Sequence, residues 1–206
     1  MDQYSQYDLR EDDPYLIEGS DCLQNLLGFT DTKSLNHAEE QLTQLTMAEL
    51  VADPVPATFD LKHLQAIHFR IFEDVYPFAG QCRQTEILKG GKLFLPHNMI
   101  EQVSTEVFTE LHSENLLQGL APAEFGKRAG YYLGKINMIH PFREGNGRTQ
   151  RVLVDQLASL NNFALEWAAI SGEGMARACR EARTTDPDGT ALQRLLSLHT
   201  VLPSSR

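Results

Sequence analysis

Twelve consecutive residues, 140–151, carry the groups in this chain that are best suited to catalysis. They combine an imidazole, a carboxylate, three guanidinium groups and two glycines around an asparagine: His140, Pro141, Phe142, Arg143, Glu144, Gly145, Asn146, Gly147, Arg148, Thr149, Gln150 and Arg151. An imidazole with its ordinary pKa of about 6.5 can accept a proton from an attacking hydroxyl near neutral pH. His140 is therefore the candidate general base.

The glycines of this run lie at the start of a helix that we predict from near Asn146 to about Leu160. A helix N-terminus presents unpaired N–H groups and partial positive charge, and glycine has no side chain to block an approaching anion. Arginines three residues apart share one helix face, and their planar guanidinium groups can grip phosphate oxygens. These features predict a polyphosphate site formed by Gly145, Asn146, Gly147, Arg148 and Arg151.

A carboxylate beside this site would repel a polyphosphate unless a divalent cation lay between them. Mg²⁺ is commonly held by one or two carboxylates together with substrate phosphates. Glu144 is therefore a candidate Mg²⁺ ligand, although a carboxylate at a helix N-terminus is favourable without a metal as well. A purely structural role for His140 is the alternative to the general base. We expect Phe142 to anchor the loop in the core and Arg143 to point to solvent.

The rest of the chain is acidic. Its 206 residues carry 28 acidic and 18 basic side chains, a net charge of −10. This charge argues against sequence-independent binding to nucleic acid or to an anionic membrane. Three widely spaced cysteines predict free thiols. We expect residues 1–13 to be a flexible N-terminal arm without a secretory signal, residues 14–206 to be a single domain, and the protein to be cytoplasmic.

Residues 140–151 are called the catalytic run below. The elements that position this run are predicted to be helices. Apolar residues at helical spacing, Pro breaks and a capping carboxylate at Asp60 define most of them. Pro141 prevents the helix before it from continuing, so His140 lies at the end of a buried helix face. The predicted helices cover Thr32–Leu50, Leu61–Ile71, Asn98 to about Gln118, Pro122 to about His140, Asn146 to about Leu160, Leu165–Ala169, Glu173–Arg183 and Ala191–Leu198.

One segment breaks the helical pattern. Thr85–Lys89 and Lys92–Leu95 are typical of two short strands, and Gly90 and Gly91 are typical of a tight turn between them. A hairpin of this size is marginal alone and must lean on the helices. It is either a plain connector or a functional flap.

The run His140-Pro-Phe-x-Glu144-Gly-Asn-Gly-Arg148-x-x-Arg151 resembles the active-site signature of Fic-domain proteins. Asp13-Pro14-Tyr15, with Gly19-Ser20 and Asn25-Leu-Leu-Gly28, resembles the opening of the bacterial toxin branch of this family. Ile71-Phe-Glu-Asp-Val-Tyr76 and Gly130-Tyr-Tyr-Leu also resemble the family. The resemblance extends from about Asp13 to the terminal helices. It implies an all-α Fic fold, a helical bundle with a small β-hairpin flap near residues 83–96.

The resemblance also implies protein adenylylation, in which AMP passes from ATP to a Tyr, Ser or Thr hydroxyl of a target protein and pyrophosphate is released. His140 would then be the general base and Glu144 the Mg²⁺ ligand. The hairpin would dock the target by strand addition. The nucleotide would contact Gly145, Asn146, Gly147, Arg148, Thr149 and Arg151, with Arg151 reaching the γ-phosphate and Lys89 and Gly90 as candidate adenine contacts.

Many members of this family are restrained by a helix with a Ser/Thr-x-x-x-Glu-Gly/Asn motif, whose Glu pairs with the last signature arginine. Glu precedes Gly or Asn in this chain at Glu18, Glu114, Glu144 and Glu173. The residues four positions earlier are Pro14, Glu110, His140 and Ala169. Because none is Ser or Thr, we expect a separate small helical antitoxin to supply the inhibitory Glu.

Two alternatives remain open at the level of sequence. A Fic enzyme could transfer another phosphate-containing group, such as UMP, phosphocholine or phosphate, although the phosphate-transferring branch has Lys where this chain has Gly147. The chain could also be a non-catalytic nucleotide-binding regulator, but a pure binder needs neither His140 nor Glu144. An effector injected into a host cell is an alternative to the cytoplasmic toxin.

Overall fold

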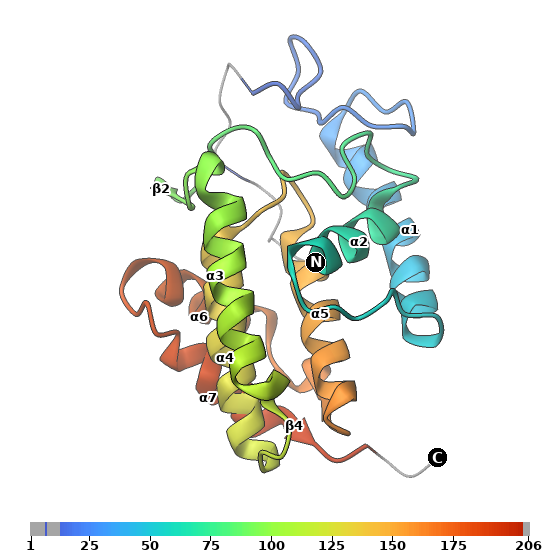
Figure 1. Ribbon diagram of the computed structural model, residues 1–206. Helices are drawn as coiled ribbons and strands as arrows, with labels where there is room; N and C mark the ends of the chain where they lie inside the picture. Colours follow the sequence, from blue (N-terminus) through green and yellow to red (C-terminus); the bar gives the residue numbers. More distant parts are fainter. Residues whose placement is uncertain (1–6, 8–12, 204–206) are drawn as a thin grey trace.

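The chain folds mainly into α-helices, which confirms the predicted fold class. The computed structural model describes Tyr7 and residues 13–203 (Figure 1). The predicted arm, residues 1–13, therefore lies outside the described residues except for Tyr7 and Asp13. The helices of the described part are α1 (Thr32–Ala52), α2 (Leu61–Phe72), α3 (Ile100–Ser113), α4 (Pro122–Ile139), α5 (Asn146–Leu160), α6 (Gly172–Thr184) and α7 (Thr190–His199).

Three of these helices begin at residues whose chemistry favours a helix start. The carboxylate of Asp31 accepts the N–H of Ser34 at 2.9 Å, and that of Asp60 accepts the N–H of His63 at 2.7 Å. Each bond satisfies an N–H that the helix itself leaves unpaired. Pro122 lies in the first turn of α4, where its missing N–H costs nothing. Local sequence signals therefore fix these boundaries.

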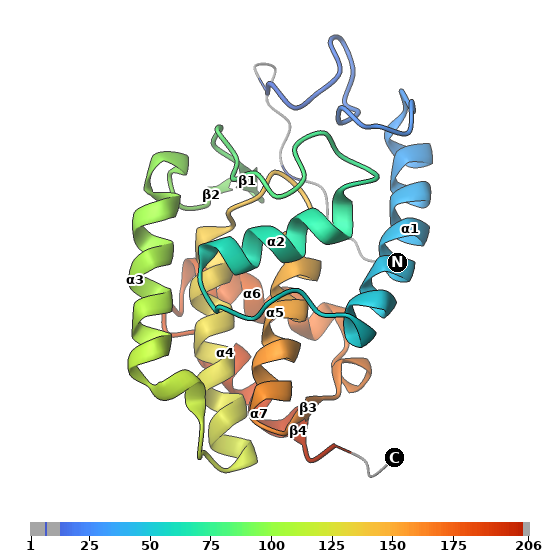
Figure 2. The ribbon, with the colours of Figure 1, turned by 45° about the vertical axis from the view of Figure 1, so that its right-hand side comes forward.

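The helices α4 and α5 lie side by side, and α2 runs across the ends that their connection joins (Figure 2). The inner face of α4 is the one that the sequence predicts. Its buried residues include Phe125, Ala129, Tyr132, Leu133 and Ile136. Burial of such side chains is the main stabilising contribution to the core. The connection between α4 and α5 is the catalytic run, so the core directly holds the candidate site.

The closest packing in the core is between α4 and α7. A β-carbon on Gly126 would lie 2.4 Å from the carbonyl oxygen of Leu196, and one on Gly130 would lie 2.5 Å from Cα of Gln193. No side chain fits at these distances. Glycine at these two positions lets the two backbones approach each other, and this contact fixes how the terminal helices sit against α4.

The predicted hairpin is present, although its strands are shorter than expected. Strands β1 (Leu88–Lys89) and β2 (Lys92–Leu93) are antiparallel, with Leu88 opposite Leu93. Gly90 and Gly91 have φ of 61° and 69°, a left-handed conformation that glycine adopts at little cost. Beyond the strands, Ile87 and Phe94 are buried. The hairpin thus leans on the body of the molecule.

Two predicted helices differ in the structure. The helix expected from Asn98 to about Gln118 ends at Ser113, because Asn115, Leu116 and Leu117 all have positive φ, in a 3₁₀ turn (Asn115–Leu117). The helix expected over Leu165–Ala169 is instead strand β3 (Ala164–Leu165) and a 3₁₀ turn (Trp167–Ala169). Strand β3 pairs with β4 (Thr200–Val201), a distant partner that periodicity cannot reveal.

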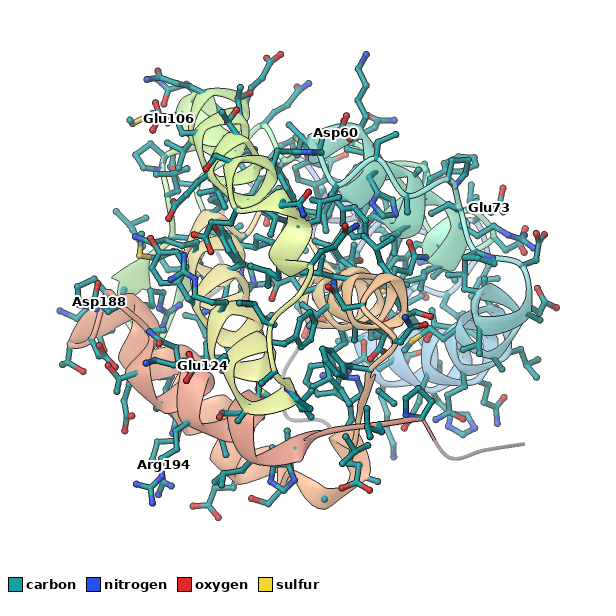
Figure 3. All side chains as sticks on the ribbon, turned by 60° about the horizontal axis from the view of Figure 1, so that its bottom comes forward. Asp60, Glu73, Glu106, Glu124, Asp188 and Arg194 are labelled. Carbon is teal, nitrogen blue, oxygen red and sulfur yellow. The ribbon has the colours of Figure 1, made fainter. Side chains whose placement is uncertain are left out.

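Most charged side chains of the described residues lie on the outside of the molecule. Figure 3 shows Glu106, Asp188 and Arg194 near the outline of the molecule. The cysteines Cys22, Cys82 and Cys179 are free, as predicted. In the part of the chain that the structure describes, no helix is both long and apolar enough to cross a membrane.

Candidate active site

The catalytic run forms a tight turn between α4 and α5. His140 ends α4 in a left-handed conformation, with φ of 49°. Gly145 precedes α5 with φ of 77°, and a β-carbon there would lie 2.2 Å from two ring carbons of Phe72. Gly145 is therefore required both by its backbone and by its contact with α2. The turn leads directly into the first residues of α5, where the sequence predicts the anion site.

His140 is buried and held in one tautomer. Its Nδ1 lies 3.0 Å from the carbonyl oxygen of Asn137, and since a carbonyl only accepts, Nδ1 carries the proton. In the neutral ring, Nε2 then has the free lone pair. Burial lowers the pKa of His140 to about 3, and the nearby charges of Arg83, Lys89 and Arg183 also lower it. The imidazole is therefore neutral and able to accept a proton.

The turn is braced by Asn146 and by a buried histidine of α2. The amide of Asn146 accepts the N–H of Phe142 at 2.9 Å and donates to its carbonyl at 2.7 Å. The ring of His68 stacks on Phe142 at 3.9 Å and donates to the carbonyl of Glu144 at 3.0 Å. Phe142 is buried, which confirms its predicted role as an anchor. The side chain of Asn146 thus serves to shape the turn.

Gly147 and Arg151 form the open part of the cradle. Gly147 is exposed, and the nearest heavy atom to a β-carbon placed on it would be Nη1 of Arg151, at 4.0 Å. Arg151 is half-buried, and within the described residues its guanidinium forms neither a hydrogen bond nor an ion pair. The helix N-terminus, the open glycine and this guanidinium can together hold phosphate oxygens.

Arg148 is directed towards α1. Its guanidinium donates to the carboxylate of Glu39 and, at 3.1 Å, to Oγ1 of Thr43. The carboxylate of Glu39 is buried and also accepts the phenol O–H of Tyr76. Local sequence does not reveal this pairing. A phosphate bound by Arg148 would share the guanidinium with Glu39.

Glu144 is buried beside a second carboxylate, that of Glu39. Its Oε1 accepts the N–H of Gly145 at 2.8 Å and lies 3.6 Å from the guanidinium of Arg148. Burial, together with the nearby charge of Glu39, raises the pKa of Glu144 to about 7. A cation would favour the ionised form, so this carboxylate fits a Mg²⁺ ion whose other ligands are phosphate oxygens and water.

The other residues predicted to contact the nucleotide differ in burial and in the partners that they already have. Thr149 is buried, and its hydroxyl donates to the carbonyl of Gly145 at 3.0 Å, so it stabilises the first turn of α5. Lys89 is half-buried on the hairpin, and Gly90 is exposed at its tip. The charge of Lys89 acts on His140. The structure therefore brings Lys89 near His140, whereas the Thr149 hydroxyl is engaged within α5.

Arg83 is a buried positioning residue that the sequence analysis missed. Its Nε donates to the carbonyl of His140 at 2.9 Å, and its Nη1 donates to the carbonyl of Thr85 at 2.8 Å. A further bond reaches the carbonyl of Leu95. Arg83 thus ties both sides of the hairpin to the catalytic turn. The only local signal was a basic residue just before the predicted strands.

The prediction that Arg143 points to solvent is wrong. Its side chain is buried, and Nε donates to the carboxylate of Asp13 at 2.8 Å. The burial of this charge is compatible with the fold because Asp13 pairs with it. Asp13 lies 130 positions earlier, so no local pattern could have predicted the pair.

The phenol of Tyr7 reaches the same site. Its hydroxyl lies 2.9 Å from Nε2 of His140 and accepts from the amide of Asn146 at 3.1 Å. The ring packs edge-on against His140, with centroids 5.7 Å apart. Burial and the carboxylate of Glu144 raise the pKa of Tyr7, so its phenol is protonated at neutral pH. The sequence analysis did not identify this residue.

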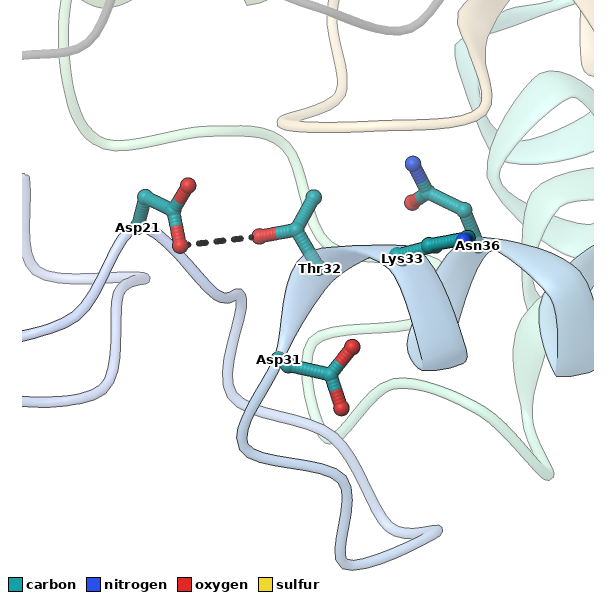
Figure 4. A pocket seen from close by; sticks show the side chains of 5 residues that line it. All are labelled: Asp21, Asp31, Thr32, Lys33 and Asn36. Atoms are coloured by element: carbon teal, nitrogen blue, oxygen red, sulfur yellow. Dashed lines mark hydrogen bonds between the residues drawn. The ribbon is translucent and has the colours of Figure 1, made fainter.

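A separate hollow lies at the start of α1 (Figure 4). Asp21, Asp31, Thr32, Lys33 and Asn36 line it, and the hydroxyl of Thr32 donates to Asp21 at 3.1 Å. Two of these residues are carboxylates, and Asp31 already caps α1. None of the residues 140–151 lines this hollow, so it is distinct from the candidate active site.

Known proteins resemble this chain in sequence and in fold. Residues 58–158 match the model of the Fic/DOC family. The chain is 34% identical over 185 residues to the Escherichia coli protein named "Probable protein adenylyltransferase Fic", and the match covers 90% of each chain. It is 37% identical over 170 residues to the Bartonella schoenbuchensis protein named "Protein adenylyltransferase VbhT", covering 82% of this chain and 36% of that protein.

The chain thus spans about a third of the Bartonella schoenbuchensis relative and most of the Escherichia coli one. A solved structure of the N-terminal Fic domain of a Bep effector from Bartonella quintana, with bound ADP, is also similar. It has a TM-score of 0.84 and 26% identity, covering 91% of this chain and 94% of that one. The family match, the fold and the sequence identity show that the chain belongs to the Fic/DOC family.

Proposed function

We propose that this chain is a protein adenylyltransferase, which transfers AMP from ATP to a hydroxyl of a target protein. One observation carries the proposal: a neutral imidazole, with Nε2 as its acceptor atom, lies at one end of a turn whose other end opens onto a phosphate cradle. The names of the Escherichia coli and Bartonella schoenbuchensis relatives support it. A proton acceptor next to a phosphate site is what transfer to a hydroxyl requires.

In this proposal His140 accepts the proton of the attacking hydroxyl while the hydroxyl oxygen bonds to the α-phosphorus of ATP. Pyrophosphate leaves as the bond from the α-phosphorus to the bridging oxygen breaks. The N–H groups at the start of α5 and the guanidinium of Arg151 bind the phosphates. Glu144 would hold Mg²⁺, and the bound ion would neutralise phosphate charge.

The hairpin would align the target segment. Strands β1 and β2 form a two-stranded sheet, and such a sheet has edges to which a further strand can add through main-chain hydrogen bonds. Arg83 couples this hairpin to the carbonyl of His140. Alignment on the hairpin would therefore place a target hydroxyl relative to the base.

A separate protein would restrain the enzyme by supplying a Glu to Arg151. The support is the absence of the inhibitory motif from the sequence and the lack of an ion pair to this guanidinium within the described residues. Affinity capture of the tagged chain, coexpressed with the small proteins encoded beside it, should recover a short helical partner that lowers activity. Recovery of no partner, together with an inactive isolated chain, would contradict this part of the proposal.

The His140→Ala variant tests the activity itself. With ATP labelled at the α-phosphate and a bacterial lysate as acceptor, label transfer should fall by about 10²–10⁴-fold, the usual contribution of a general base. Nucleotide binding should persist, because the cradle is formed by α5. The thermal unfolding curve of the variant controls for misfolding. Undiminished transfer by the variant, or transfer of γ-label in place of α-label, would refute the assignment.

A further inference from the structure

The two arginines on either side of Glu144 in the catalytic run are each paired with a carboxylate from the N-terminal part of the chain. Arg143 donates to Asp13, and Arg148 donates to Glu39 of α1. Neither guanidinium donates a hydrogen bond to Glu144, whose donor within the described residues is a main-chain N–H. The carboxylate of Glu144 thus lies near two cations that other acids already hold.

Arg148 could reach Glu144 after a small movement. Its Nη2 lies 3.6 Å from Oε1 of Glu144, just beyond the distance of a hydrogen bond. A direct ion pair between the two side chains would neutralise the charge that a bound cation needs. Whether Glu144 keeps its charge for a cation therefore depends on how firmly Arg148 is held elsewhere.

Contacts with α1 and α2 hold the guanidinium of Arg148. Nη2 donates to the carboxylate of Glu39, and Nη1 donates to Oγ1 of Thr43 at 3.1 Å. The hydroxyl of Thr43 donates its own proton to the main-chain carbonyl of Glu39 at 2.8 Å, so its oxygen can only accept from Arg148. The guanidinium also lies over the ring of Phe72, 4.7 Å from the centroid. Together these contacts turn Arg148 towards α1.

Glu39 is buried, and both of its carboxylate oxygens have donors. One accepts from Arg148 and the other accepts the phenol O–H of Tyr76. A buried ion pair often stabilises a fold no more than apolar residues of similar volume would. The charge of Glu39 also acts against a second buried carboxylate, since it raises the pKa of Glu144. Stability alone therefore does not account for an acid at this position.

We propose that Glu39 is a positioning residue that holds Arg148 away from Glu144 and so leaves the Glu144 carboxylate available to Mg²⁺. The inference rests on the proposed function, in which Glu144 holds this ion. Glu39 engages the guanidinium that would otherwise neutralise Glu144, and it adds a second negative charge that attracts a cation. Without Glu39, the guanidinium of Arg148 would turn to Glu144 and the ion would bind more weakly.

Calorimetric titration of the purified chain with ADP, in excess Mg²⁺ and in EDTA, tests this inference without turnover. The ratio of the two affinities is the gain due to the ion. At pH 8, above the pKa of Glu144, Glu39→Gln should reduce this gain about tenfold, a usual effect of losing a residue that supports a metal ligand. Two controls should keep the wild-type gain. Tyr76→Phe removes only the phenol bound to Glu39, and Glu49→Gln removes an exposed charge from the same helix.

The results separate this inference from the function on which it rests. A wild-type gain in Glu39→Gln, together with a lost gain in Glu144→Gln, would overturn the inference and leave Glu144 as the metal ligand. A gain retained in Glu144→Gln, or absent from the wild-type chain, would contradict both the metal role of Glu144 and the inference. Transfer of α-label to lysate proteins by the wild-type chain reports the adenylyltransferase function separately.

A crystal structure of the wild-type chain with ADP and Mg²⁺ gives a second result, which does not depend on the folding of any variant. Nη2 of Arg148 should still donate to Glu39, with the Glu144 carboxylate bound to the ion. A guanidinium turned from Glu39 to Glu144 in that complex would overturn the inference.

Discussion

The buried carboxylate of Glu144 lowers the stability of the fold when it is ionised. Its carboxylate is buried near a second carboxylate, that of Glu39, and has one main-chain donor. In the unfolded chain its ordinary pKa is about 4.5, whereas in the folded chain it is about 7. The ionised form is therefore less stable in the folded chain. A bound cation would stabilise the ionised carboxylate and so offset this loss of stability.

This leads to a prediction for Glu144→Gln. Between pH 4.5 and 7 the folded chain binds the proton more tightly, so Glu144 stabilises the fold at low pH and loses this effect as the pH rises. At pH 8 the buried charge remains, and removing it should raise Tm by several degrees, since each kcal/mol is worth about 2–4 °C in a chain of this size. The difference should shrink as the pH falls towards 4.5. Calorimetry of the two apo proteins across this range measures it, and an equal or lower Tm at pH 8 would contradict it.

At the scale of elements, the turn between α4 and α5 determines what the site can hold. Its two glycines have different roles. Gly145 is buried and needs its positive φ, and its missing side chain leaves room for Phe72. Gly147 lies in the first turn of α5, exposed and with no close neighbour on its Cα. The first glycine shapes the fold, and the second keeps the cradle open to an anion.

The pair of variants Gly145→Ala and Gly147→Ala should separate these roles. Gly145→Ala should lose several kcal/mol of stability, because it adds a contact at 2.2 Å and a strained φ. Gly147→Ala should keep its stability but bind ATP roughly tenfold more weakly, equivalent to about 1.4 kcal/mol, because its methyl group partly blocks the cradle. Denaturant unfolding and calorimetric titration with ATP measure the two effects. Equal stability losses in both variants would argue against this division.

At the scale of the whole molecule, the contact between α4 and α7 holds the terminal helices on the helix that ends at His140. Gly126 and Gly130 place the two backbones in direct contact. Gly134, one turn further along, has its nearest neighbour at 3.6 Å, an ordinary distance for a side chain. One face of α4 thus has two glycines that the packing requires and one that it does not.

Gly130→Ala should therefore destabilise the chain by about 1–3 kcal/mol or more, as overpacking of a core usually does. Gly134→Ala is the matched control, and it should be neutral or stabilise by up to about 1 kcal/mol, since alanine favours a helix over glycine. The midpoints of urea unfolding measure both changes. A Gly130→Ala variant as stable as Gly134→Ala would show that the two helices can separate at no cost.

Features encoded by neighbouring residues could be predicted from the sequence. The caps at Asp31 and Asp60, the Gly90-Gly91 turn and the ends of α4 and α5 depend on groups a few positions apart. The catalytic run is local in the same way, because the end of one helix and the start of the next place its groups together. The signature, the family and the mostly helical fold follow from such patterns.

Tertiary structure alone decided which distant side chains meet this run. Glu39 pairs with Arg148 across 109 positions, Arg83 holds the carbonyl of His140 across 57, and Tyr7 reaches Nε2 of His140 across 133. Strand β3 and the early end of α3 likewise follow from distant contacts and local left-handed residues. Such contacts form when buried groups find partners in the packed chain, and the sequence around each residue carries no periodic trace of them.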